Sequence, residues 1–255
     1  MTTPDLVNTV VVVAACVLLA GLTYIRKILD HLGSLLGFIL GLVIGLFGSL
    51  LWLIMLLIFL ITAFAATRYK YSLKNDLGAA EPKGGTRGFA SVLANSWVPM
   101  VVAMLSFENP WLSTFPKNVA AVLYLTAISA AASDTIASEL GVLSSRTFMI
   151  TTGKPCKPGT NGGVSALGTS AALAAAAYTS IVGWMVLLLF SGQLSGFPVW
   201  FIVIPLTMGF AGCQIDSLLG ATLENRGMLN KDRVNILSIG AATLLALALM
   251  TAIGW

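Results

Sequence analysis

Charge is the first thing that this sequence has little of. Of its 255 residues only 9% are charged, 57% are hydrophobic, and the mean hydropathy is +0.92. A soluble globular domain carries about 25% charged residues. The shortage of charge therefore excludes an ordinary soluble protein and predicts a chain that is embedded in a membrane.

Histidine and cysteine are also scarce. The chain has one histidine, His31, and three widely spaced cysteines, Cys16, Cys156 and Cys213. Scattered cysteines form neither a disulfide framework nor a metal-binding spacing, and one histidine cannot build a zinc motif. No Ser/His/Asp arrangement has a usable histidine, and the sequence contains neither a dinucleotide fingerprint nor a P-loop. Acyl transfer and hydride transfer are therefore disfavoured.

Long apolar runs are what the sequence has instead. A helix needs ~20 residues to cross a bilayer. Several runs are long enough, and we predict eight spans, near residues 6–25, 33–48, 49–67, 88–107, 118–140, 163–190, 197–220 and 234–253. Only Gly48-Ser49 separates the second run from the third, so seven spans remain open if that pair is one long tilted helix. We predict an all-α fold, a polytopic transmembrane helical bundle in which residues 1–255 form one integral membrane domain.

The basic residues indicate the orientation of the bundle. A secretory signal peptide would begin with Lys or Arg residues, but none precedes the first run. We therefore predict that this run is a retained span. If the spans alternate, Lys117 alone of the 14 Lys and Arg residues falls on one side. The positive-inside rule makes the opposite side cytoplasmic and puts both termini outside. Topology explains these charges, and nothing in their pattern indicates a nucleic-acid partner.

The first polar segment on that cytoplasmic side reads "LGAAEPKGGTRGFASVLAN", residues 77–95. Lys83 and Arg87 flank a pair of glycines, and cations beside flexible glycines suit phosphate binding. Asn95 lies two turns inside the next helix, on the same face as Arg87. We expect a functional role for all three, although a plain cytoplasmic turn would also carry such charges.

Two further segments place carboxylates near the cytoplasmic ends of apolar spans. They read "AASDTIASELG", residues 131–141, and "CQIDSLLGATLENRG", residues 213–227. A carboxylate at membrane depth costs on the order of 3 kcal/mol on insertion scales. Oxygen ligands of this kind suit Mg²⁺. We predict a magnesium site formed by Asp134, Glu139 and Asp216; helix-end solvation or an intramembrane salt bridge is the alternative.

The glycine-rich loop "TTGKPCKPGTNGGV", residues 151–164, lies between two apolar spans. We expect Thr160 and Asn161 to cap a helix that begins near Gly163, where bare amides would bind an anion. A flexible turn is the simpler interpretation. The candidate phosphate-binding residues of this loop are Lys154, Lys157, Thr160, Asn161, Gly162 and Gly163.

Four motifs then stand together in order: "RGFASVLAN", "SDTIASELG", "GTNGGVSALG" and "DSLLGATLE". This set resembles the membrane family that includes transmembrane protein 19 and the plant and cyanobacterial phytyl-phosphate kinases. The resemblance extends from Gly33 to the last span, and the short N-terminus is more similar to a prokaryotic member than to a plastid one. It implies an enzyme of the prokaryotic cell membrane that converts phytyl or geranylgeranyl phosphate to the diphosphate, with CTP as the expected donor.

The resemblance and the chemistry together assign roles. Phosphoryl transfer depends on positioning and charge neutralisation, and an anionic acceptor needs no general base. Mg²⁺ on the three acids would bridge the donor phosphates, and Asn95 would orient the acceptor. The expected neutralising cations are Lys83, Arg87, Lys154 and Lys157. The isoprenoid tail would lie in a groove between spans, in or beside membrane lipid.

Two alternatives remain open at this point. A CTP-dependent cytidylyltransferase making a CDP-lipid would use the same parts, with a different phosphorus attacked. A transporter with a cytoplasmic-side acidic site would also place acids in membrane helices. Transporters bind their substrates near the membrane midplane, whereas these polar residues gather at one face of the membrane. This difference favours an enzyme over a transporter. A homodimer stays open as well.

Overall fold

The computed structural model describes residues 6–107, 116–190 and 198–254. Eight helices are long and apolar enough to cross a membrane, so the prediction of eight spans is confirmed. They are α1 (Leu6–Ile25), α2 (His31–Val43) with the π-helical turn η1 (Ile44–Gly48), α3 (Leu50–Arg68), α6 (Phe89–Ser106), α7 (Lys117–Gly141), α8 (Ala166–Phe190), α9 (Trp200–Leu219) with the π-helical turn η2 (Gly220–Glu224), and α10 (Lys231–Ala252).

The break between the second and third spans decides against seven. Ser49 is extended, with φ −170° and ψ 166°, and its Oγ accepts a hydrogen bond from the backbone N–H of Trp52 at 3.3 Å. A serine that caps a helix in this way starts a new helix. Gly48 permits the tight passage, because a Cβ there would lie 2.5 Å from the Trp52 ring.

Helix α7 is the centre of the bundle. It is enclosed almost entirely and contacts α3, α6, α8, α9 and α10. Small residues allow this packing: a Cβ on Gly209 would collide with Ser129, and one on Gly183 would collide with Leu125. Membrane helices approach closely where small residues meet, since lipid supplies no hydrophobic force between them. The carboxylates of α7 are therefore held by a rigid central element.

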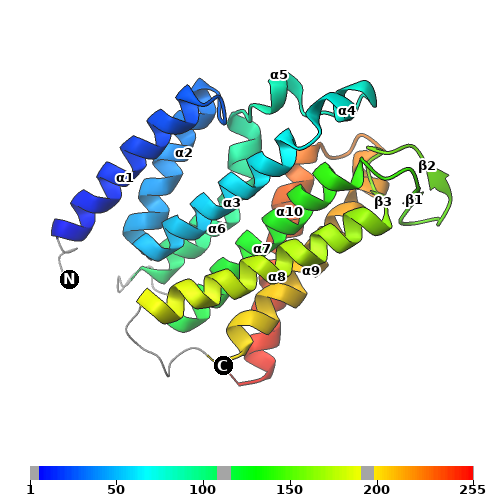
Figure 1. Cartoon of the computed structure of the whole chain (residues 1–255). Coiled ribbons are helices and arrows are strands. Elements are labelled where there is room, and N and C mark those ends of the chain that lie inside the picture. Colours follow the sequence, from blue (N-terminus) through cyan, green and yellow to red (C-terminus); the bar gives the residue numbers. More distant parts are fainter. Residues whose placement is uncertain (1–5, 108–115, 191–197, 255) are drawn as a thin grey trace.

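Polar elements gather at one end of the bundle. Figure 1 shows the short helices α4 (Tyr71–Asp76) and α5 (Pro82–Gly85) and the sheet at this end, with the start of α1 and the end of α10 at the other. The sheet is antiparallel in the order β2 (Pro155–Cys156), β1 (Thr147–Met149), β3 (Gly163–Val164). The sequence did not predict it, because strands of two or three residues leave no readable alternation.

Candidate functional site

A cavity opens at this polar end, between α7, α9, the start of α10 and the loops that bracket the sheet. Its empty volume, mouth included, is about 1120 Å³. Its charged lining residues are Glu81, Asp134, Glu139, Asp216, Glu224 and Lys231. We call it the acidic cavity, since five of these six residues are acids.

Asp134 of α7 and Asp216 of α9 lie side by side in the wall of the acidic cavity, close enough for their carboxyl groups to hydrogen-bond. Both are half-buried. The Ser238 hydroxyl of α10 donates to Asp216 Oδ2 at 2.9 Å and fixes the orientation of that carboxyl group. Two carboxylates this close repel each other unless a proton or a cation lies between them. The arrangement is therefore suited to holding a cation.

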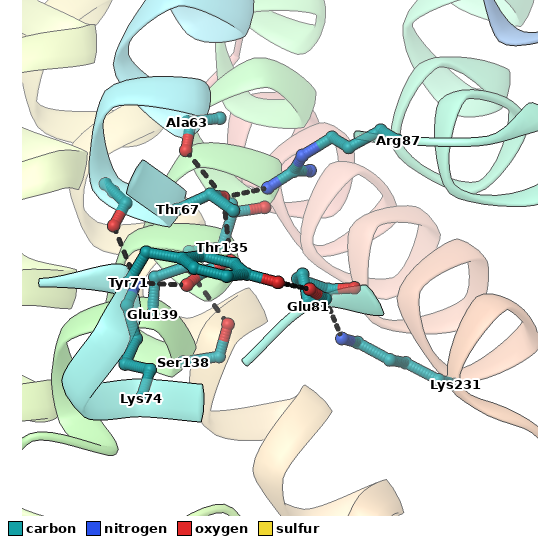
Figure 2. A network of polar contacts seen from close by, with 11 residues as sticks. Ala63, Thr67, Tyr71, Lys74, Glu81, Arg87, Thr135, Ser138, Glu139 and Lys231 are labelled. Atoms are coloured by element: carbon teal, nitrogen blue, oxygen red, sulfur yellow. Dashed lines mark hydrogen bonds and ion pairs between the residues drawn. The ribbon is translucent and has the colours of Figure 1, made fainter. Parts of the chain in front are cut away.

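Glu139 has a different environment, although it also borders the cavity. Its Oε2 lies 2.6 Å from Lys74 Nζ, and its Oε1 accepts from Thr67 Oγ1 at 2.7 Å (Figure 2). Lys74 is fully buried and also donates to the Ala66 carbonyl at 2.8 Å. Among the described residues, no group of three His, Cys, Asp or Glu side chains is placed to hold a metal ion. The structure thus joins two of the three expected magnesium ligands and ties the third to a lysine.

The glycine-rich loop does form a wall of the acidic cavity, through Thr160, Asn161, Gly162 and Gly163. Gly162 has φ +78° and touches Ala221 of η2, where a Cβ would lie 2.6 Å from Ala221 Cα. Only glycine allows this approach, since other residues carry the Cβ and rarely adopt that φ. The loop therefore packs directly against η2, the turn that continues the helix of Asp216.

The expected cap of helix α8 is wrong. The helix begins at Ala166, and its first turn is capped by Ser165, whose Oγ accepts from the Gly168 N–H at 3.1 Å. Gly163 instead belongs to strand β3, and its N–H donates to the Thr160 carbonyl at 2.8 Å. Pairing of β3 with β1 carries the chain past the point where the sequence suggested a helix start.

None of the four expected cations lines the acidic cavity, and Arg87 borders a different one. Lys154 and Lys157 are exposed on the sheet, and Lys83, with 73% of its side chain exposed, lies 3.4 Å from Asp30. The described lining contains one cation, Lys231, whose Nζ lies 2.6 Å from Glu81 Oε1 (Figure 2). Sequence reasoning missed Lys231, because its charge was already explained by topology and its partner lies 150 residues away.

Lys231 also determines the ionisation of its partner. Partial burial pushes the pKa of Glu81 upward, but the charge and hydrogen bond of Lys231, helped by Arg87 and Lys74, leave that pKa below its ordinary value. Glu81 is therefore a carboxylate at neutral pH and forms an ion pair with Lys231, the lysine of the acidic cavity. The Glu81 carbonyl is held as well, since the Tyr71 hydroxyl donates to it at 2.7 Å (Figure 2).

Arg87 and Asn95 border a second cavity, described further below, that is mostly apolar. Arg87 Nη2 donates to Thr67 Oγ1 at 3.3 Å, and Thr67 in turn donates to Glu139 (Figure 2). Burial lowers the pKa of Arg87, while the carboxylates of Glu81, Glu139 and Asp134 oppose that shift, so the guanidinium stays charged. A chain of three side chains thus links the two cavities.

Comparison with known proteins gives the family. Residues 14–246 match the profile of a family described as "Integral membrane protein DUF92". Three relatives are the uncharacterized membrane protein MJ0933 of Methanocaldococcus jannaschii (34% identity over 60% of this chain), Protein PGR of Arabidopsis thaliana (32% over 66%) and Protein VTE6, chloroplastic, of the same plant (30% over 74%).

The matched segments cover 58%, 63% and 55% of those relatives, respectively, so the chain spans less than two thirds of their lengths. No solved structure matches the chain. The family profile, in contrast, covers nearly all of the bundle from the middle of α1 to the last turns of α10. The resemblance to the transmembrane protein 19 and phytyl-phosphate kinase family is thereby confirmed, and the chain belongs to the family of integral membrane proteins described as DUF92.

Proposed function

We propose that this protein is a Mg²⁺-dependent membrane kinase that transfers the terminal phosphoryl group of a nucleoside triphosphate, with CTP preferred, to an isoprenoid monophosphate. The observation that carries the proposal is the Asp134–Asp216 pair, which shares one cavity with Lys231 and the glycine-rich loop. Family membership supports the same chemistry. The proposed acceptors are phytyl or geranylgeranyl phosphate, and the product is the diphosphate.

The residues of the acidic cavity fit a magnesium ion. Mg²⁺ is commonly held by one or two carboxylates together with substrate phosphates, so a third protein carboxylate is not required. Asp134 and Asp216 would hold the ion, and Ser238 would keep Asp216 in place. When bound, the ion neutralises negative charge on the donor phosphates. Glu139, which is paired with Lys74, would not be needed to hold the ion.

The chain's other residues position the donor. Lys231 would contact the phosphates in place of Lys154 and Lys157, and the donor would displace Glu81 from it. The loop from Thr160 to Gly163 would pack along the phosphate chain. Lys83, Lys154 and Lys157 lie at the same end and would raise the local concentration of anionic substrates without touching them.

The transfer itself is a simple exchange of bonds. A phosphate oxygen of the acceptor forms a bond to the terminal phosphorus of the donor, and the bond from that phosphorus to the leaving nucleoside diphosphate breaks. The acceptor is already an anion, so no proton has to be removed. Arg87 would orient it, with Asn95 behind, because Arg87 reaches toward the acidic cavity through Thr67. Arginine holds phosphate groups with several fixed donors.

We place this polar end of the bundle in the cytoplasm of a prokaryotic cell, where nucleoside triphosphates are available. All Lys and Arg residues except Lys117 lie at or near this end, as the positive-inside rule requires of a cytoplasmic face. Both termini would then face the outside.

The test is the identity of the product. Purified protein in lipid nanodiscs would be incubated with Mg²⁺, a panel of prenyl monophosphates and each nucleoside triphosphate in turn. The mass of the extracted lipid would then be measured by mass spectrometry. We expect a prenyl diphosphate, formed best with CTP and abolished by EDTA. A CDP-linked lipid would establish cytidylyl transfer instead, and an unmodified lipid with every nucleotide would refute both.

A further inference from the structure

The second cavity lies between α1, α2, α3 and α6, and its empty volume, mouth included, is about 770 Å³. All of its lining residues except Leu29 and Arg87 belong to these four membrane-crossing helices. Most of the lining is hydrocarbon, for example Leu40, Leu53 and Phe59, which are almost fully buried. We call it the apolar cavity. Its walls are suited to a long alkyl or isoprenoid chain.

One feature of this cavity is not explained by packing. Three buried polar atoms along it have no hydrogen-bond partner: Ser34 Oγ, Arg87 Nε and Asn95 Oδ1. Ser34 is 7% exposed and Asn95 is 4% exposed. Burying a polar atom without a partner is unfavourable and rare in native proteins, so three such atoms in one cavity indicate a ligand that completes their hydrogen bonds.

The geometry of these residues is fixed by other contacts. Asn95 Nδ2 donates to the Ser91 carbonyl at 2.9 Å, which leaves its Oδ1 as the unpaired acceptor. The backbone of Arg87 is tied to the loop before α2, since its N–H donates to the Ile28 carbonyl and its carbonyl accepts from the Asp30 N–H, each at 3.0 Å. Gly33 permits this approach, because a Cβ there would lie 2.9 Å from the Arg87 carbonyl oxygen.

The unpaired atoms match a phosphate monoester. Arg87 Nε and the Ser34 hydroxyl can donate to phosphate oxygen atoms, and Asn95 Oδ1 can accept from a protonated oxygen or an ordered water. The positive charge of Arg87 complements the anion. The same guanidinium donates to Thr67, and Thr67 donates to Glu139 at the edge of the acidic cavity (Figure 2). A phosphate held at Arg87 is therefore adjacent to the donor site.

We propose that the apolar cavity binds the isoprenoid monophosphate, with its chain between α1, α2, α3 and α6 and its phosphate at Arg87, Ser34 and Asn95. The identity of this ligand rests on the proposed function; the class of ligand, a long-chain phosphate monoester, rests on the cavity. The binding of this ligand requires neither nucleotide nor metal.

The test is photolabelling of the full-length protein in nanodiscs, with EDTA present and no nucleotide. The probe is a C20 prenyl monophosphate that carries a photoactivatable group at the far end of its chain. We expect the label in peptides from α1, α2, α3 and α6. Label confined to α8, α9 and α10 would overturn the proposal, as would equal competition by an excess of phosphatidylglycerol, a phosphodiester, which would identify the occupant as bulk lipid.

Matched variants sharpen the test. Ala20→Phe fills the cavity from α1, whereas Leu18→Phe changes a neighbour that is 63% exposed and does not line it. We expect Ala20→Phe to weaken probe binding by about tenfold and Leu18→Phe to leave it unchanged. Unchanged binding by folded Ala20→Phe, judged by gel filtration, would overturn the proposal.

Arg87→Gln gives a readout that does not depend on cavity filling. It should weaken binding of the C20 monophosphate by about tenfold or more and leave binding of the neutral C20 alcohol unchanged, because only the monophosphate carries a charge that pairs with the guanidinium. Equal loss for both ligands would contradict the phosphate position. Binding as expected without any phosphoryl transfer would reject the proposed function and leave the binding site standing.

Discussion

The buried Lys74–Glu139 pair yields the sharpest prediction about stability. Lys74 has none of its side chain exposed and Glu139 has 6%, with 2.6 Å between Nζ and Oε2. Glu139→Gln would leave the charge of Lys74 buried beside the Ala66 carbonyl, without its carboxylate partner. Breaking a buried pair by removing one charge typically costs about 3–5 kcal/mol. We therefore expect Glu139→Gln to lower the unfolding midpoint of the detergent-solubilised protein by roughly 10 °C.

The assay is thermal unfolding followed by intrinsic fluorescence, with a double-mutant cycle. The double variant Lys74→Met/Glu139→Gln should regain most of the lost stability, since no unpaired charge is left, and should retain the proposed kinase activity in nanodiscs. Asp76→Asn, an exposed acid at the end of α4, is the control. A stable Glu139→Gln variant that is inactive and no longer responds to Mg²⁺ would refute the structural role of Glu139 and restore it as a metal ligand.

Three further predictions concern the acidic cavity and its rim. Because the folded-state pKa of Glu81 is lowered, its ion pair contributes stability above the unfolded pKa of about 4.3, and that contribution falls away as the pH drops through the folded pKa. With Glu81 34% exposed the loss should stay below about 1 kcal/mol, and Glu81→Gln should abolish it in unfolding midpoints measured between pH 7 and pH 3. Lys231→Met should raise the KM for CTP by about tenfold while exposed Lys157→Ala changes it less than about twofold; steady-state kinetics showing the reverse order would return the phosphate role to the sheet. Gly162→Ala should force the loop away from Ala221 and lower kcat/KM for CTP, and unchanged kinetics would show that the loop does not contact the donor.

The membrane architecture could be predicted from the sequence because it depends on one local property, the length of each apolar run. Runs of ~20 apolar residues report spans wherever they occur. One shift at a helix start has a clear cause: α8 begins at Ala166 and not near Gly163, because strand β3 takes up Gly163–Val164. That pairing is set by Phe148 and Met149, which are distant in sequence.

The site could be predicted only in part, because the contacts between its side chains are not a local property of the sequence. Asp134 and Asp216 could be expected at the same end of the bundle, because both precede the end of a span that runs toward the same side. The partners of the charged groups could not be expected, since they depend on helix order and rotation. Lys74 is paired with Glu139, which lies 65 residues away in the sequence, and Lys231 is paired with Glu81, which lies 150 residues away. The positive-inside rule already accounted for both lysines and so concealed their contacts.

The most direct test of the central claim links the phosphoryl transfer to the carboxylate pair. Protein in nanodiscs would receive Mg²⁺, CTP labelled in its terminal phosphate and a C20 prenyl monophosphate, and the label in the lipid would be counted for the native chain, Asp134→Asn, Asp216→Asn and the control Asp76→Asn. We predict labelled prenyl diphosphate with the native chain and the control, and at least about a 100-fold lower rate with either cavity variant, all four proteins being folded. Equal transfer by a folded Asp134→Asn/Asp216→Asn double variant would contradict the account.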